Sequence, residues 1–223
     1  MKALVFDLDD TLYNESDFVH GAFMEVAQYL SNKHCILCDE LYHAMLKLLH
    51  EKGRGRIFND ICDLYNLDED INNLIKIYRN AVPPISLYED AEYFLKYSKE
   101  RCKLGLITDG LYYVQRNKIR LLGIEKYFDS IIVTDEHGEG FCKPGIKPYL
   151  KMAENLGVAL DSMIYVGDNP RKDFYGARQL GVYTVRIIRP AGDHMGLRLG
   201  SDYEADREIT NMYELKAVID TLK

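Results

Sequence analysis

The stretch Lys2-Ala3-Leu4-Val5-Phe6 followed by Asp7-Leu8-Asp9-Asp10-Thr11-Leu12 decides how this chain folds. Its first part is mostly apolar and suits a buried parallel strand, and three carboxylates follow within four positions. Asp7 and Asp9 are two positions apart, so on an extended backbone both side chains point to the same side. Carboxylates this close repel one another and favour a divalent cation, most naturally Mg²⁺. Taken alone, the stretch also fits a strand that ends in a solvated acidic turn.

Length and charge narrow the class of protein. The chain has 223 residues, which is enough for one α/β domain or for such a domain with a smaller insertion. Its 28 Lys and Arg against 35 Asp and Glu give a net charge of −7, so there is no basic field to recruit nucleic acid. No apolar run approaches the ~20 residues of a membrane helix. We expect a cytoplasmic monomer or homodimer with no nucleic-acid or membrane partner.

The number of cysteines is consistent with the cytoplasm. There are five, an odd number, which argues against a disulfide framework and fits reduced thiols. Cys35 and Cys38 form a Cys-x-x-Cys pair, but no second pair follows to complete a zinc site. We interpret them as ordinary cysteines.

The apolar pattern over residues 14–82 predicts a helical insertion. Apolar residues recur at helical spacing from Ser16 to about Lys33, and a second helix is predicted to start at Asp39 as its N-cap. Two more helices are predicted over 56–66 and 69–81. Pro83-Pro84 then stops helical geometry and forces an extended link.

Strands and helices alternate after that link. Strands are predicted over 103–107, 131–133, 163–166 and 183–186, with a short one near 208–209 and helices between them. This alternation predicts a doubly wound, mainly parallel, Rossmann-like sheet, so residues 1–13 and 83–223 form an α/β core. An insertion after the first strand would lie above the carboxyl ends of the strands, where ligands bind and a lid is useful.

The conspicuous polar residues of the core all follow predicted strands. They are Asp7 and Asp9, Thr108 and Asp109, Lys143, and Asp168 with Asp173. Carboxyl ends of parallel strands share one edge of a sheet, so we expect these side chains to converge.

The converging groups suit phosphoryl transfer. Asp7 can act as nucleophile and carry a phosphoryl group, and Asp9 can protonate the leaving oxygen and later deprotonate water. Thr108 and the backbone near Gly110 can bind phosphoryl oxygens, while Lys143 neutralises charge. Asp168 would complete the oxygen ligands of Mg²⁺.

Four motifs in this order resemble those of the haloacid dehalogenase-like hydrolase superfamily. They are Asp7-Leu8-Asp9-Asp10-Thr11, the strand ending in Thr108-Asp109-Gly110, Lys143-Pro144, and Gly167-Asp168 with Asp173 five residues after Asp168. The resemblance covers the whole chain and implies a helical cap after the first strand. It also implies Mg²⁺ at Asp7, Asp9 through its backbone carbonyl, and Asp168, with Asp173 supporting the site.

Asp109 and Asp9 refine what the resemblance implies. We expect the substrate phosphate to be contacted by Thr108, Asp109, Gly110 and Lys143. Many members of the superfamily have Asn where this chain has Asp109, and a carboxylate cannot donate a hydrogen bond as an amide does. Haloacid dehalogenases do not need the acid/base that Asp9 supplies, so dehalogenation is not expected.

The expected function is a Mg²⁺-dependent phosphomonoesterase that acts on a small phosphorylated metabolite, such as a sugar phosphate or nucleotide, through an aspartyl phosphate. A phosphomutase of the same family is one alternative, because the sequence does not show whether water or a second hydroxyl attacks the acyl phosphate. A phosphoacceptor or binding module is another, although such receiver-like domains lack the helical insertion.

Substrate identity is expected to depend on the insertion. Arg54 and Arg56 flank Gly55 at a helix break and can reach a second anionic group or sugar hydroxyls. Alternatively, both are solvated charges at a helix end.

Overall fold

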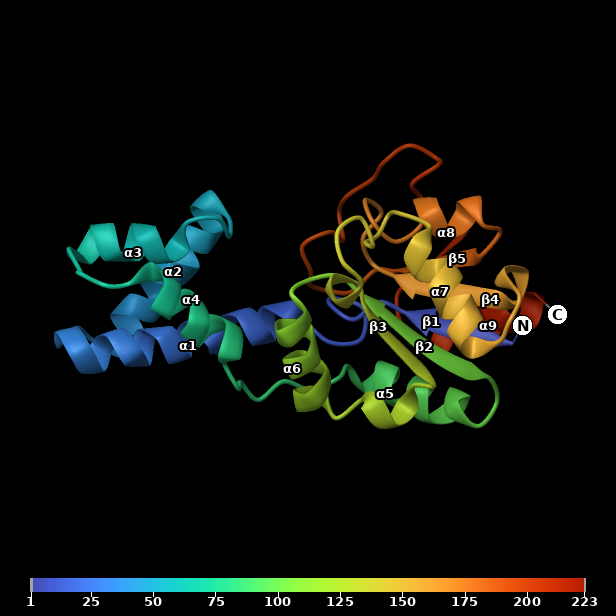
Figure 1. Cartoon of the computed structure of the whole chain (residues 1–223), viewed down its shortest axis with the longest axis horizontal. Helices are drawn as coiled ribbons and strands as arrows, with labels where there is room; N and C mark the ends of the chain where they lie inside the picture. Colours follow the sequence, from blue (N-terminus) through green and yellow to red (C-terminus); the bar gives the residue numbers. More distant parts are fainter. Residues whose placement is uncertain (1, 223) are drawn as a thin grey trace. The chain divides into compact units, whose positions relative to one another are not determined.

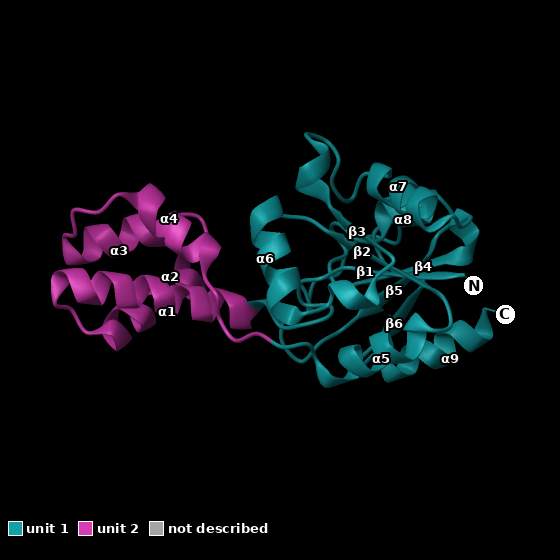
Figure 2. Ribbon diagram, turned by 60° about the horizontal axis from the view of Figure 1, so that its bottom comes forward, with its two compact units in different colours: residues 1–15, 86–223 teal, residues 16–85 magenta. Residues whose placement is uncertain are grey.

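The computed structural model describes residues 2–222 and divides into two compact units. One unit consists of residues 1–15 and 86–223, and the other of residues 16–85 (Figure 2, teal and magenta).

The first unit is built on a six-stranded sheet in the order β3-β2-β1-β4-β5-β6 (Figures 1 and 2). Every neighbouring pair of strands is parallel. The strands are β1 (Ala3–Phe6), β2 (Lys103–Thr108), β3 (Ser130–Val133), β4 (Met163–Gly167), β5 (Tyr183–Ile187) and β6 (Arg207–Ile209). This parallel α/β sheet confirms the predicted fold class. The opening stretch supplies its central strand, and all four residues of β1 are buried.

Strand register brings the ends of three strands level with one another. Phe6 lies opposite Leu106 of β2 and Val166 of β4. The backbone N–H of Asp7 donates to the carbonyl of Val166 at 2.9 Å, which extends the pairing by one residue. The residues that follow β1, β2 and β4 therefore leave the sheet at one edge.

Five α-helices belong mainly to this unit. They are α5 (Glu89–Lys99), α6 (Tyr112–Leu122), α7 (Lys147–Leu156), α8 (Tyr175–Gln179) and α9 (Tyr213–Thr221). Three short 3-10 helices, η1 (Glu125–Tyr127), η2 (Thr134–His137) and η3 (Leu160–Ser162), complete the connections. Residues of α7 and α8 pack with Val5, Ile107 and Tyr165 in one buried apolar cluster.

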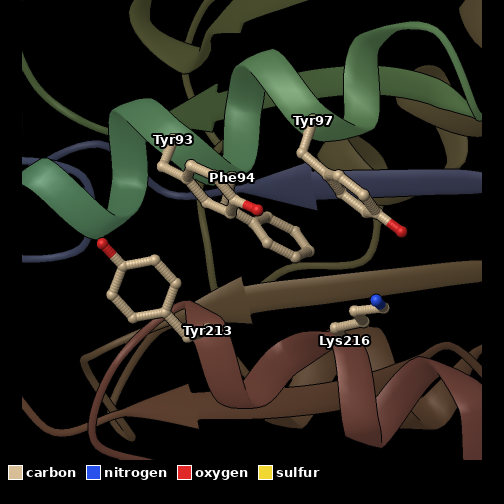
Figure 3. Close-up of a pocket in the computed structure, with 5 residues that line it drawn as sticks. All are labelled: Tyr93, Phe94, Tyr97, Tyr213 and Lys216. Atoms are coloured by element: carbon tan, nitrogen blue, oxygen red, sulfur yellow. The ribbon is translucent and has the colours of Figure 1, made fainter.

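Helices α5 and α9 meet away from that cluster. The ring centroids of Tyr93 and Tyr213 lie 5.4 Å apart, and a groove lies between the two helices (Figure 3). Its lining consists of Tyr93, Phe94, Tyr97, Tyr213 and Lys216. No residue predicted to be functional lines this groove.

The second unit is helical. It contains nearly all of α1 (Glu15–His34), together with α2 (Cys38–Lys52), α3 (Ile57–Tyr65) and α4 (Ile71–Asn80), around its own apolar cluster. The predicted N-cap of the second helix is wrong, because α2 begins at Cys38 with Leu37 as N-cap and Asp39 lies in its first turn. There the carboxylate still interacts favourably with the positive end of the helix dipole.

The described residues include no helix with both the length and the apolar character needed to cross a membrane. All five cysteines are free thiols.

Candidate active site

The predicted residues gather where the strand order reverses. The chain leaves β1 toward β2 on one side, whereas β4 pairs with β1 on the other. Ligands bind outside the carboxyl ends of strands at such a switch point. Asp7 directly follows β1 and Asp168 directly follows β4, so both side chains start from this position.

Three carboxylates form a tight acidic cluster here. Asp7, Asp168 and Asp173 are buried, and each has an oxygen within 4.8 Å of the others. Burial raises the pKa of Asp7 to about 8 and that of Asp168 to about 9, with Asp173 adding repulsion at both. Charges packed this closely favour either protonation or a bound cation.

The cluster fits Mg²⁺. Asp168 Oδ2 is buried and accepts no hydrogen bond from any residue in 2–222. A buried carboxylate oxygen without a donor is costly unless a ligand satisfies it. Carboxylate oxygens are the ligands Mg²⁺ prefers, and Asp7 and Asp168 supply them from two neighbouring strands.

Lys143 offsets part of this negative charge. Its Nζ donates to Asp7 Oδ1 at 2.5 Å, to Asp173 Oδ1 at 2.7 Å and to the hydroxyl of Tyr165 at 2.9 Å. Burial alone would lower the pKa of Lys143, but Asp173 and Asp7 raise it well above its ordinary value. The side chain is therefore a buried, fully charged ammonium with three hydrogen-bond partners.

Asp173 is fixed by the loop after β4. Its Oδ2 accepts the backbone N–H of Asn169 at 2.8 Å, and its Oδ1 accepts the hydroxyl of Tyr165 at 3.0 Å. A Cβ at Gly167 would lie 2.4 Å from Asp173 Oδ2. Glycine at 167 thus allows the carboxylate to approach the end of β4 and to hold Lys143.

The carboxylate of Asp9 lies outside the acidic cluster found among residues 2–222. Its Oδ1 accepts from the hydroxyl of Tyr13 at 2.6 Å and from Lys118 Nζ at 2.7 Å, and its Oδ2 accepts from Gln115 Nε2 at 2.8 Å. Lys118 also donates to Glu15 Oε1 at 3.1 Å. The side chain is oriented by donors on both oxygens, as a group that transfers protons requires.

Thr108 and Asp109 end β2 beside these groups. The Thr108 hydroxyl is buried and accepts from Gln115 Nε2 at 2.6 Å. Asp109 Oδ1 accepts from the Thr134 hydroxyl at 2.8 Å and from the backbone N–H of Lys143 at 3.3 Å. These partners are donors, so an acceptor-only carboxylate suits this position, and it ties β2 to the segment that carries Lys143. Its contact with substrate stays a prediction.

Arg54 and Arg56 lie in the second unit, between α2 and α3, and both are exposed. Their contact with substrate stays a prediction.

Sequence reasoning missed four residues that contact the site. Tyr165 bonds to Lys143 and Asp173, while Tyr13, Gln115 and Lys118 bond to Asp9. One signal was available: Gln115 and Lys118 are three positions apart and share one face of α6 with Ile119, all three buried. Polar residues on the buried face of a helix usually have a specific partner.

Comparisons with known proteins agree with this geometry. The family described as haloacid dehalogenase-like hydrolase matches residues 4–187. A glyceraldehyde 3-phosphate phosphatase of Methanocaldococcus jannaschii is 32% identical and covers 100% of this chain and 99% of its own length. The protein of the same name from Methanopyrus kandleri is 29% identical over 98% of this chain and 97% of its own.

Among solved structures, a HAD phosphatase from Thermococcus onnurineus is 30% identical, with a TM-score of 0.65. The match covers 98% of both chains. Sequence, fold and the order of the four motifs lead to the same assignment: the chain belongs to the haloacid dehalogenase-like hydrolase family.

Proposed function

We propose that this protein is a Mg²⁺-dependent phosphatase in which Asp7 carries the phosphoryl group of a small phosphorylated metabolite. The observation that supports this most strongly is the buried cluster of Asp7, Asp168 and Asp173 with the Lys143 ammonium bonded to two of them. A nucleophilic carboxylate and an anionic substrate repel each other, and this arrangement supplies positive charge where they meet.

In the first half-reaction an oxygen of Asp7 attacks phosphorus, and the bond from phosphorus to the ester oxygen breaks. Asp9, in its protonated form, donates its proton to that departing oxygen, so an alcohol leaves. Lys143 offsets the charge around Asp7, and the Thr108 hydroxyl donates to a phosphoryl oxygen. The product of this step is an acyl phosphate on Asp7.

In the second half-reaction water attacks the phosphorus of the acyl phosphate. Asp9, now a carboxylate, accepts a proton from the water, and the bond from phosphorus to Asp7 breaks. Inorganic phosphate leaves and the Asp7 carboxylate is restored. Asp7, Asp168 and the backbone carbonyl of Asp9 would hold Mg²⁺, with Asp173 in support, and the ion would neutralise charge between enzyme and phosphate.

Glyceraldehyde 3-phosphate is the first substrate to test, because two relatives that match nearly the whole chain carry it in their names. We expect Mg²⁺-dependent, multiple-turnover release of phosphate from it and, more slowly, from p-nitrophenyl phosphate. A panel of sugar phosphates and nucleotides provides the comparison. Absence of phosphate release from every compound in the presence of Mg²⁺ would overturn the proposed function, and chelation by EDTA should stop any release observed.

The affinity for Mg²⁺ should rise with pH. Because burial raises the pKa of Asp7 to about 8 and that of Asp168 to about 9, both carboxyls bind protons near neutrality in the metal-free protein. Mg²⁺ must displace these protons, so its affinity should increase between about pH 6 and pH 9, with protons released. Isothermal titration calorimetry in buffers of different ionisation enthalpy measures both quantities, and a pH-independent affinity without proton release would contradict the site.

The pH dependence of stability has the same origin. A carboxyl whose folded pKa is raised stabilises the fold only while it is protonated, so the metal-free protein should lose stability as pH rises toward about 8 to 9. Thermal unfolding at saturating Mg²⁺ should show a smaller loss, because binding to the folded state adds stability.

Two alternative activities make different predictions. A phosphomutase would isomerise a sugar phosphate in the presence of a bisphosphate activator, and a phosphoacceptor module would take up phosphate once without repeated release. We favour hydrolysis because the relatives that match nearly the full chain are named phosphatases.

The helical unit of residues 16–85 is proposed to act as the cap, with Arg54 and Arg56 facing substrate. Replacement of both by Ala should raise KM for a sugar phosphate more than for p-nitrophenyl phosphate. The proposed compartment is the cytoplasm, which suits five free thiols.

A further inference from the structure

Gln115 occupies an unusual position on α6. The residue is 2% exposed, and one atom of its side chain, Nε2, lies 2.8 Å from Asp9 Oδ2 and 2.6 Å from Thr108 Oγ1. The amide therefore bridges the residue proposed to transfer protons and the residue proposed to bind phosphate. Asp9 and Thr108 are 99 positions apart, on separate strand ends, and Gln115 connects them directly.

The chemistry of the partners fixes the orientation of this amide. A carboxylate only accepts hydrogen bonds, so the NH₂ group of Gln115 must face Asp9, and its carbonyl oxygen there would be repelled. An amide nitrogen has two N–H bonds, which is enough for Asp9 and Thr108 together. Since Thr108 Oγ1 then accepts from Gln115, its own hydrogen remains available to donate to a phosphoryl oxygen.

The surroundings keep the bridge in place. Lys118, three residues later on α6, donates to the other oxygen of Asp9, and the backbone N–H of Tyr112 at the start of the helix donates to Asp135 Oδ2 at 2.9 Å. Gly110 has a φ of +133°, and a Cβ there would approach Gln115 Cγ and Cδ at 3.2 Å. Glycine at 110 thus leaves room for the bridging side chain.

We infer that Gln115 is a positioning residue that sets the Asp9 carboxylate and the Thr108 hydroxyl against the same phosphoryl group. Asp9 must meet the bridging oxygen of the substrate while Thr108 meets a non-bridging oxygen, so their separation has to match the phosphate ester. This inference rests on the proposed function, because it takes proton transfer by Asp9 as given.

The test compares two aryl phosphates of similar shape. Phenol is a poorer leaving group than p-nitrophenol, so hydrolysis of phenyl phosphate depends more on a well-placed acid. For Gln115→Leu we expect kcat/KM to fall roughly 30-fold with phenyl phosphate and only about 3-fold with p-nitrophenyl phosphate. The comparison uses kcat/KM because this ratio reports the transfer of the phosphoryl group from substrate to Asp7. It does not depend on the later hydrolysis of the acyl phosphate, which is the same step for both substrates.

Gln115→Met separates hydrogen bonding from packing. Methionine keeps the length of the unbranched side chain but has no N–H donor, so we expect it to change the substrate ratio about as much as Gln115→Leu. Arg116→Leu is the matched control. Arg116 is the next residue on α6 and its side chain pairs with Glu136 at the surface, so its loss should leave the ratio of kcat/KM for the two substrates unchanged. Circular dichroism and Tm establish that each variant is folded.

Three results would overturn the inference: equal losses with both substrates, a Gln115→Met enzyme with the wild-type ratio of activities, or a control variant that shifts this ratio equally. Failure of the proposed function is recognised separately, because the wild-type enzyme would then release no phosphate from either substrate with Mg²⁺.

Discussion

Replacing Asp7 with Asn should abolish phosphate release while leaving the protein folded. The amide is a poor nucleophile and cannot form the acyl phosphate, so we expect kcat with p-nitrophenyl phosphate to fall by about 10⁴-fold or more, as when a catalytic nucleophile is removed. Initial rates at saturating Mg²⁺ measure the effect. Turnover within tenfold of wild type would exclude Asp7 as the nucleophile.

The stability of this variant distinguishes lost chemistry from lost structure. Burial raises the pKa of Asp7 from its ordinary value to about 8 in the folded protein, so ionisation of this group opposes folding near neutral pH. Asparagine removes that penalty. We therefore expect the metal-free variant to have a Tm at or above that of the wild type, and a large decrease in Tm would contradict our account of the acidic cluster.

Replacing Lys143 with Met should damage both stability and activity. The ammonium is buried and donates to Asp7 and Asp173, so its removal leaves the buried Asp173 carboxylate without its counter-charge and both carboxyl groups without this donor. Breaking a buried pair from one side typically lowers the free energy of unfolding by about 3–5 kcal/mol. Chemical denaturation without Mg²⁺ measures this loss, and kcat should fall by roughly 10²–10³-fold because a charge-stabilising donor is lost.

Lys151→Met provides the matched control for that experiment. Lys151 lies on α7 in an exposed pair with Glu154 at 2.8 Å, and such pairs contribute only about 0–1 kcal/mol. Equal destabilisation by the two substitutions would contradict the structural role of Lys143. Lys143→Arg keeps the charge and should recover part of the lost stability.

The predictable part of the site follows from strand topology. Asp7, Thr108 and Asp168 each lie at the end of an apolar segment, and parallel pairing places those ends at one edge whatever the details of packing. Lys143 was predictable for the same reason, although its contacts join residues up to 136 positions apart. The helical unit was predictable from the sequence because apolar residues recur at helical spacing in each of its four segments.

The rest depends on tertiary geometry that no local pattern records. Gln115 and Lys118 are polar residues on a helix face that faces the site, and their partner Asp9 was expected to act from beside Asp7. In the sequence, Tyr165 resembles an ordinary core residue of β4. Its hydroxyl nevertheless accepts a hydrogen bond from Lys143 and donates one to Asp173. Such pairings require knowing which side of each element meets which neighbour.

The central claim is that Asp7 carries the phosphoryl group, and borohydride trapping tests it most directly. Protein quenched during turnover of p-nitrophenyl phosphate with Mg²⁺ is treated with borohydride, which reduces an acyl phosphate to an alcohol, and its peptides are sequenced by mass spectrometry. We predict homoserine at position 7, with Asp9 and Asp168 unchanged and no trapping in Asp7→Asn. Trapping at another residue, or none while turnover proceeds, would contradict the account.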